Sequence, residues 1–292
     1  MQADIFSTVF LPVSLGLLML GMGLSLTIED FKQVVVHPRS LITGLFCQMV
    51  LMPLVAFGIT MIADLPQEIK IGFIIIAICP GGATSNLISY LLRGNVALAI
   101  SMTTVNSLLT LITIPLLLYF ALHYYLDVSR LIPLPLGPTI IKIFYVTLLP
   151  TSIGVLIRYY RRNIAHKLEH HLRYILPILY GIIFIIAILG TKRVHPTELP
   201  GIYFHVAPWG LLLNLIGMSL GLIMARLYRL KNQDQISLTV EIGIHNSALA
   251  ITIAGSAMFL NNYVMAIPAI VYGLFSFITT LLFGYAVKAY SH

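Results

Sequence analysis

Long uninterrupted runs of apolar residues restrict what this sequence can fold into more than any other feature. A helix needs about 20 apolar residues to cross the hydrocarbon core of a bilayer, and runs of this length recur along the whole chain. Only 9% of the 292 residues are charged, whereas a soluble domain carries roughly a quarter. The runs lack the alternation of membrane β-barrel strands. We therefore expect an all-α polytopic membrane protein.

Polar clusters, prolines and glycines divide the runs into nine candidate transmembrane helices. The predicted spans are residues 5–26, 39–62, 69–91, 96–124, 139–158, 174–191, 202–226, 236–258 and 264–288. Residues 29–36 are a candidate for a short interfacial helix. The gaps between spans are too short for a soluble domain, so residues 1–292 are expected to form one transmembrane domain.

The basic residues support the count of nine spans. With nine spans, the basic segment 158–173 and most other Lys and Arg fall on one side, and Lys70, Arg130, Lys192 and Arg193 on the other. The positive-inside rule then places the N-terminus outside and the C-terminus in the cytoplasm, in a multi-pass protein of the inner membrane. The net charge of +7 lies in short gaps between apolar runs, which indicates a lipid bilayer and no nucleic acid as partner.

Two of the predicted spans contain residues that break helices. The third span contains Cys79 to Asn86, CPGGATSN, in which Pro80 cannot donate to the helix ladder and each glycine costs about 1 kcal/mol relative to alanine. The eighth contains Glu241 to Ser247, EIGIHNS. An ionisable residue inside a span is a functional candidate. Two alternatives remain open: a kink used only for packing, and a Glu241 near the cytoplasmic interface.

The positions of the two broken spans predict an inverted repeat. They are the penultimate spans of a first half at about 1–125 and a second half at about 139–290, so equivalent helices cross the membrane in opposite directions. Broken helices at corresponding positions of two halves indicate a transporter's binding site. Gln48 and Asn214 lie in the middle of the second and seventh spans, again at equivalent positions. Each alone is more often an interhelical hydrogen bond than a ligand.

The residues at the breaks fit a cation and an organic anion. Sodium prefers oxygen ligands, and Glu241 supplies the charge, with neutral oxygens from Ser85, Asn86, Thr103 and Thr104. Helix N-termini at the breaks carry partial positive charge and could receive a carboxylate. The candidate substrate-binding residues are Thr84, Thr104, Asn214, Asn246 and Ser247.

Several segments resemble the bile acid:sodium symporter family across essentially the whole chain. They are GMGLSLTIEDFK, PGGATSN, YLLRGNVALAISMTTV and EIGIHNSALA. The resemblance implies two inverted repeats, divided into a panel domain and a core domain with two broken, crossing helices. It is closest to the nine-helix version of the family, which lacks the first helix.

The resemblance also implies two sodium sites. The positions that match the first are Ser85, Asn86, Thr103 and Glu241, and those that match the second are Gln48, Glu241 and the backbone of Ile242 and Ile244. Two positions depart from the family. A family hydroxyl is replaced by Ala99, and the usual glutamine by His245, whose backbone carbonyl can still bind sodium. Its imidazole titrates near physiological pH, so a proton could take part in coupling.

We therefore expect a secondary transporter, not an enzyme, with sodium as coupling ion and no other cofactor. The expected substrate is a small carboxylate such as pantoate or a 2-oxo acid, with bile acids as candidate substrates in vitro. Arsenite efflux is one alternative, with Cys79 as the thiolate that binds arsenic. Arsenite permeases share a similar design of broken helices, but the order Cys-Pro in this chain is the reverse of their Pro-Cys. A membrane-embedded enzyme is another, with Glu241 and His245 as an acid/base or metal pair that lacks a third ligand.

Overall fold

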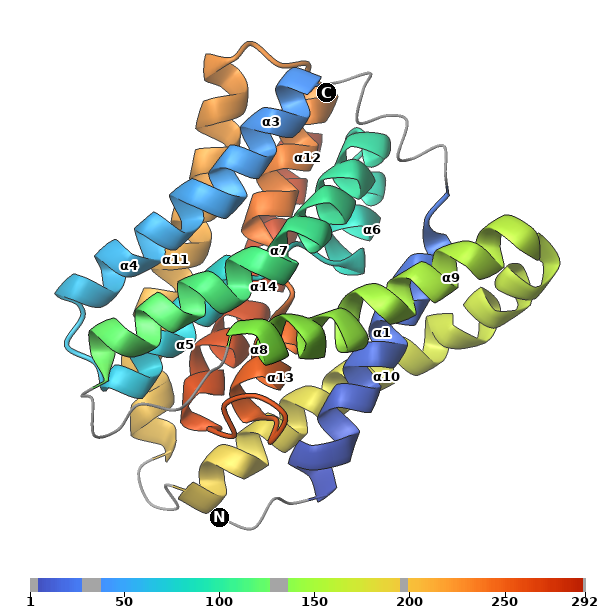
Figure 1. Cartoon of the computed structure of the whole chain (residues 1–292). Coiled ribbons are helices and arrows are strands. Elements are labelled where there is room, and N and C mark those ends of the chain that lie inside the picture. Colours follow the sequence, from blue (N-terminus) through green and yellow to red (C-terminus); the bar gives the residue numbers. More distant parts are fainter. Residues whose placement is uncertain (1–4, 28–37, 127–135, 195–198, 291–292) are drawn as a thin grey trace.

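The computed structural model describes residues 5–27, 38–126, 136–194 and 199–290, and all regular structure in these ranges is helical (Figure 1). The predicted interfacial helix at 29–36 lies outside them. The helices are η1 (Phe6–Phe10), α1 (Leu11–Ser25), α3 (Pro38–Phe46), η2 (Cys47–Leu51), α4 (Met52–Ile62), α5 (Gln67–Ile78), α6 (Ala83–Leu91), α7 (Val96–Tyr125), α8 (Leu136–Ile143), η4 (Phe144–Leu148), α9 (Leu149–Tyr160), α10 (Arg162–Val194), α11 (Leu199–Leu227), α12 (Asn232–Gly243), α13 (Ser247–Gly255), η5 (Val264–Ala266) and α14 (Ile267–Tyr290).

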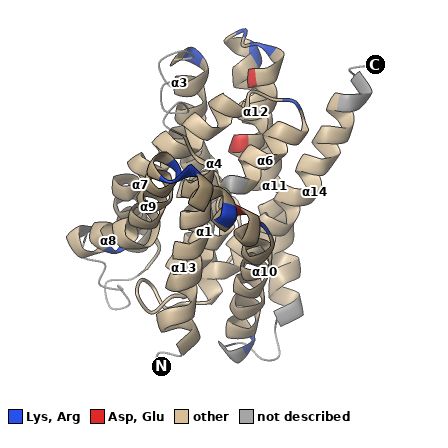
Figure 2. Ribbon diagram, turned by 90° about the vertical axis from the view of Figure 1, so that its right-hand side faces the viewer, with Lys and Arg blue, Asp and Glu red and all other residues tan. Residues whose placement is uncertain are grey.

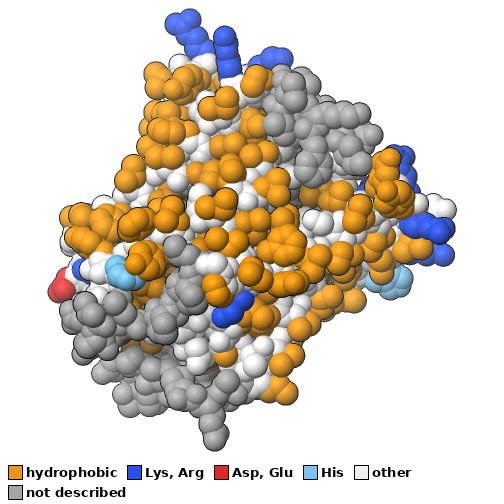
Figure 3. All heavy atoms as spheres, in the orientation of Figure 1, with side chains coloured by type: hydrophobic (Ala, Val, Ile, Leu, Met, Phe, Trp, Pro, Cys, Tyr) orange, Lys and Arg blue, Asp and Glu red, His pale blue; other side chains and the backbone are white. Residues whose placement is uncertain are grey.

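These helices confirm an all-α polytopic membrane protein. Within the described residues, eight helical stretches are long and apolar enough to cross a membrane. The remaining predicted span is the pair α5 and α6, whose 12 and 9 residues are each too short to cross alone. Apolar side chains cover much of the surface in Figure 3, as a lipid-facing surface requires. Basic residues gather mainly towards helix ends in Figure 2.

The segment 158–173 differs from the expected long connection. α9 ends at Tyr160, Arg161 alone interrupts the helix, and α10 starts at Arg162, well before the predicted span at 174. Lys, Arg, Glu and Leu form helices readily, and a helix need not stop where its apolar run stops. The apolar pattern therefore marked the membrane-crossing part of α10 and missed its polar first turns.

The breaks in the third and eighth spans occur where the sequence predicts them. α5 ends before Cys79, whose backbone is extended, and α6 restarts after Gly82. In the eighth span, Ile244 is extended, and the Asn246 side chain caps α13 by accepting from the Leu249 amide at 3.0 Å. The Asn246 amide donates to the Pro80 carbonyl at 2.8 Å, so the two broken helices meet at their breaks.

The helices pack in two groups. In the first group, α1 packs closely on α9 and α10, and a Cβ at Gly23 would collide with the Thr151 backbone. The second group surrounds α12 and α13, which are almost wholly buried. This grouping is compatible with a panel and a core domain. That division, the inverted repeat and its boundaries remain predictions.

A buried polar contact holds the start of α12 in place. Asp234 is 4% exposed and accepts hydrogen bonds from the Ser40 hydroxyl at 2.7 Å and the Asn95 side-chain amide at 2.8 Å. These donors belong to α3 and to the N-cap of α7, respectively. α12 is thereby fixed against α3 and α7, and α7 also carries Thr103, which contacts Glu241 two turns further along α12.

Candidate functional site

Glu241 lies in the last turn of α12 and is completely buried, with 0% of its surface exposed. The carboxylate is therefore enclosed by the protein, and its depth within the membrane stays a prediction. A Cβ at Gly81, in the break between α5 and α6, would overlap the Glu241 carboxylate. The carboxylate thus packs directly against the backbone of the other broken helix, which only glycine permits at this distance.

Several oxygens lie around Glu241, and the single Thr103 proton cannot serve all of those near it. The Thr103 hydroxyl lies 2.5 Å from Glu241 Oε1, 3.0 Å from the Ala99 carbonyl and 3.3 Å from Asn86 Oδ1. A hydroxyl carries one proton, so it cannot satisfy three acceptors. Glu241 Oε2 has no hydrogen-bond partner among the described residues. A surplus of buried acceptor oxygens around one carboxylate is the chemistry of a cation site.

The remaining expected ligand of the first sodium site, Ser85, lies beside this cluster. The Ser85 side chain is a neighbour of the Glu241 carboxylate, and its hydroxyl donates to the Gly82 carbonyl at 2.6 Å. Ala99 is fully buried and contributes its backbone carbonyl to the surroundings of Thr103. The structure therefore brings Ser85, Asn86, Thr103 and Glu241 together.

Gln48, in the second span, contacts the backbone of Glu241. Its amide nitrogen lies 3.4 Å from the Glu241 backbone carbonyl, while its Oε1 is buried without a hydrogen-bond partner among the described residues. Gln48 lies in η2, a π-helical turn within an otherwise α-helical span, and such turns are frequent at functional sites. The unpaired Gln48 oxygen is a second candidate ligand.

His245 lies between two backbone carbonyls. Its Nδ1 is 3.0 Å from the Ile76 carbonyl and its Nε2 is 3.1 Å from the Ile242 carbonyl. A neutral imidazole has one N–H and can donate to only one of them. These two backbone carbonyls are the polar neighbours of the ring. The ring also packs edge-on against Tyr272.

The expected substrate residues divide into two kinds. Thr84 and Ser247 lie in the first turns of α6 and α13, and Asn246 caps α13, so these three line the breaks. Asn214 donates to the Gly243 carbonyl at 2.7 Å and accepts from Thr279 at 2.6 Å. Both ends of its amide are engaged, as an interhelical hydrogen bond requires. Thr104 hydrogen-bonds the Ile100 carbonyl of its own helix at 2.8 Å.

Three residues near the site were not identified from the sequence. Gly81 accommodates the carboxylate, and the Tyr272 hydroxyl donates to the Gly243 carbonyl at 3.0 Å, which satisfies the end of α12. Asn106 lies one turn after Thr103 on α7 and is buried, and neither atom of its side-chain amide has a partner among the described residues. A polar residue isolated in an apolar run was the available signal for Asn106. Nothing in the sequence distinguished Tyr272.

Sequence comparisons identify known proteins that this chain resembles. The chain matches the family described as "Sodium Bile acid symporter family" over residues 12–195. It is 34% identical over 246 residues to "Uncharacterized sodium-dependent transporter YocS" of Bacillus subtilis, covering 84% of this chain and 73% of that protein.

Two eukaryotic relatives are more distant. "Probable sodium/metabolite cotransporter BASS2, chloroplastic" of Oryza sativa is 29% identical, with 93% of this chain and 61% of that protein covered. "Sodium/bile acid cotransporter 4" of Homo sapiens is also 29% identical, with 84% and 55% covered. The chain thus spans less than two thirds of the length of these two relatives. On the extent of the family match and the identity to the Bacillus protein, this chain belongs to the sodium bile acid symporter family.

Proposed function

We propose that the protein couples the movement of sodium to that of a small organic anion across the membrane. The observation that carries this proposal is the surplus of buried oxygens around Glu241, at the point where the two broken helices meet. A buried carboxylate without a partner is strongly unfavourable, and among the described residues no Lys, Arg or His forms an ion pair with it. Sodium would supply the missing positive charge.

Two sodium positions are proposed around this one carboxylate. Ser85, Asn86, Thr103 and Glu241 form the first, with the Ala99 carbonyl in place of the absent hydroxyl. Gln48 Oε1, Glu241 and the backbone carbonyls of Ile242, Ile244 and His245 form the second. His245 Nε2 lies 3.1 Å from the Ile242 carbonyl, so sodium at the second position would have to displace or share that contact.

The organic anion would bind where α6 and α13 begin. Both helices start at the breaks, and helix N-termini favour negative charge. Thr84, Asn246 and Ser247 would contact the substrate, whereas Thr104 and Asn214 would act through helix packing. A cation bound at Glu241 would add to the attraction, so each ligand would strengthen binding of the other. This mutual effect is what couples the two fluxes.

The names of the relatives support sodium coupling and leave the substrate class open. They refer to a sodium-dependent transporter, a metabolite cotransporter and a bile acid cotransporter. We propose a small carboxylate such as pantoate or a 2-oxo acid. The protein would lie in the inner membrane with its N-terminus outside and its C-terminus in the cytoplasm.

The alternative function, arsenite efflux, would use the Cys79 thiolate to bind arsenic. Cys79 is buried, and the described residues contain no group of three potential His, Cys, Asp or Glu metal ligands.

The test is uptake of radiolabelled pantoate and 2-oxo acids into proteoliposomes. An inward sodium gradient should drive accumulation, and a potassium gradient of equal size should not. Glu68→Gln, the same substitution at the start of α5, serves as the control and should transport like the wild type. Arsenite transport or substrate hydrolysis without sodium-driven accumulation would reject the proposal in favour of a permease for arsenite or an enzyme.

A further inference from the structure

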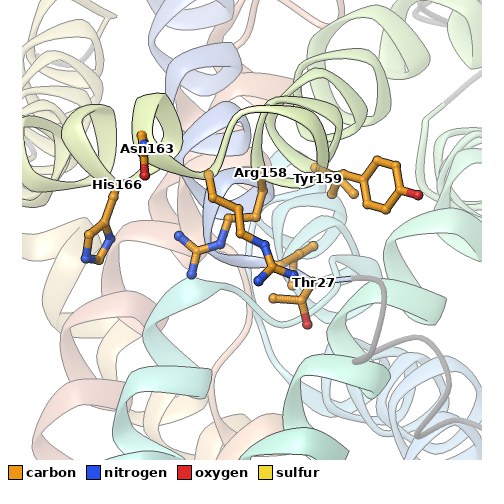
Figure 4. A pocket seen from close by; sticks show the side chains of 8 residues that line it. Thr27, Arg158, Tyr159, Asn163 and His166 are labelled. Carbon is orange, nitrogen blue, oxygen red and sulfur yellow. The ribbon is translucent and has the colours of Figure 1, made fainter.

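A hollow of about 350 Å³ lies where α9 turns into α10, beside the end of α1 (Figure 4). We call it the arginine pocket. Its polar lining consists of Thr27, Arg158, Tyr159, Arg162, Asn163 and His166. Figure 4 shows Thr27 and Tyr159 on one side of the hollow and Asn163 and His166 on the other. The pocket belongs to the group of α1, α9 and α10, and none of the proposed sodium or substrate residues lines it.

The arginine pocket carries more positive charge than its described surroundings neutralise. Glu169 pairs with Arg158 at 3.2 Å and lies 3.6 Å from His166. Among the described residues, no carboxylate forms an ion pair with Arg161 or Arg162. Of the two arginines that line the pocket, Arg158 is paired with Glu169, and Arg162 has no carboxylate partner among the described residues. Arginine binds phosphate oxygens through two parallel N–H groups, so the pocket is suited to a phosphate.

The surroundings of the pocket indicate that this phosphate belongs to a lipid. On α9, the helix that leads to the pocket, Ile153 is 43% exposed and Leu156 is 53% exposed. Tyr159 and Tyr160 are also exposed beside it, and tyrosines concentrate at membrane–water interfaces. The pocket therefore lies where an apolar, lipid-facing surface gives way to a basic one. A phospholipid has a matching arrangement, with apolar chains next to an anionic headgroup.

We propose that the arginine pocket binds the headgroup of an anionic phospholipid. Arg158 and Arg162 hold the phosphate, Tyr159 lies at the level of the glycerol backbone, and the acyl chains pass over Ile153 and Leu156. The bound lipid would hold α1, α9 and α10 to the membrane surface. Basic pockets at the membrane surface bind anionic headgroups in this way. This inference does not depend on sodium coupling or on the identity of the transported anion.

Native mass spectrometry of the detergent-purified protein tests the proposal. With equal amounts of phosphatidylglycerol and phosphatidylcholine, the wild type should retain phosphatidylglycerol selectively. The double variant Arg158→Gln/Arg162→Gln should bind it about 30-fold more weakly, since each basic residue near an anionic surface contributes roughly fivefold. The matched control Arg39→Gln/Arg226→Gln removes two other exposed basic residues from outside the pocket, and should retain the lipid as the wild type does.

Two further measurements distinguish lipid binding from binding of free phosphate and from misfolding of the variant. Inorganic phosphate at millimolar concentration should not displace the lipid, and displacement would show a site for free phosphate instead. If the double variant misfolds, Arg162→Gln alone keeps the test available, because the Arg162 side chain is exposed and has no described ion-pair partner to lose. Equal loss of phosphatidylglycerol in the pocket and control variants would overturn the proposal, since only net charge would then matter.

Discussion

Replacing Glu241 by Gln should abolish the stabilisation of the protein by sodium. The substitution keeps the side chain's volume, and an amide oxygen can still accept from Thr103, so the fold should survive. Without sodium, the wild type holds an unpaired buried carboxylate, and the neutral variant should be at least as stable. With sodium, only the wild type should gain stability, because the variant has lost the charge that binds the ion.

The expected magnitudes follow from the burial of the site. Removing one partner of a buried charge pair costs about 3–5 kcal/mol, and each 1.4 kcal/mol is tenfold in affinity, so sodium binding should weaken by at least about 100-fold. At a sodium concentration of about 100 times the wild-type dissociation constant, sodium should stabilise the wild type by about 2.7 kcal/mol. The variant should gain less than about 0.5 kcal/mol under the same conditions, by the same relation.

Thermal unfolding in detergent measures this effect, with sodium replaced by choline at constant ionic strength. Glu68→Gln is the control, because it makes the same chemical change at the far end of α5 and should keep the full sodium response. A Glu241→Gln variant with the wild-type increase in Tm would refute the assignment of Glu241 as the sodium ligand. The same variant should show no sodium-driven uptake in proteoliposomes, which links the binding measurement to transport.

The remaining predictions concern the backbone beside the carboxylate, the departure at His245 and the topology. Gly81→Ala should destabilise the protein by about 1–3 kcal/mol and impair sodium binding, whereas Gly82→Ala, which meets no atom within 4 Å, should change the Tm little. His245→Gln should preserve sodium-dependent uptake with an unchanged profile between about pH 5.5 and 7.5; a wild-type pH dependence that disappears in this variant, with little response to sodium, would instead show proton coupling. An impermeant thiol reagent applied to intact cells should miss a cysteine introduced at Asn163 and label one at Asn262, and the opposite pattern would contradict the proposed orientation.

The sequence alone determined where the membrane-crossing parts of most helices lie and where two of them break, because these properties are local. An apolar run long enough to span a bilayer must satisfy its backbone hydrogen bonds internally, and a helix does so within one segment. The predicted span 96–124 therefore agrees closely with α7, Val96–Tyr125. Pro80 and the glycines after it end α5 for reasons that need no other part of the chain. Local chemistry also singled out Glu241.

Only the tertiary structure decided what each polar residue near Glu241 does. Thr103 and Glu241 are 138 positions apart, and no local pattern specifies that the Thr103 hydroxyl meets the carboxylate. The sequence left open whether Asn214 is a ligand or an interhelical hydrogen bond, and packing against Gly243 and Thr279 uses both ends of its amide. The surplus of acceptor oxygens exists only after the helices pack. It arises because burial removes the water that would otherwise satisfy each oxygen separately.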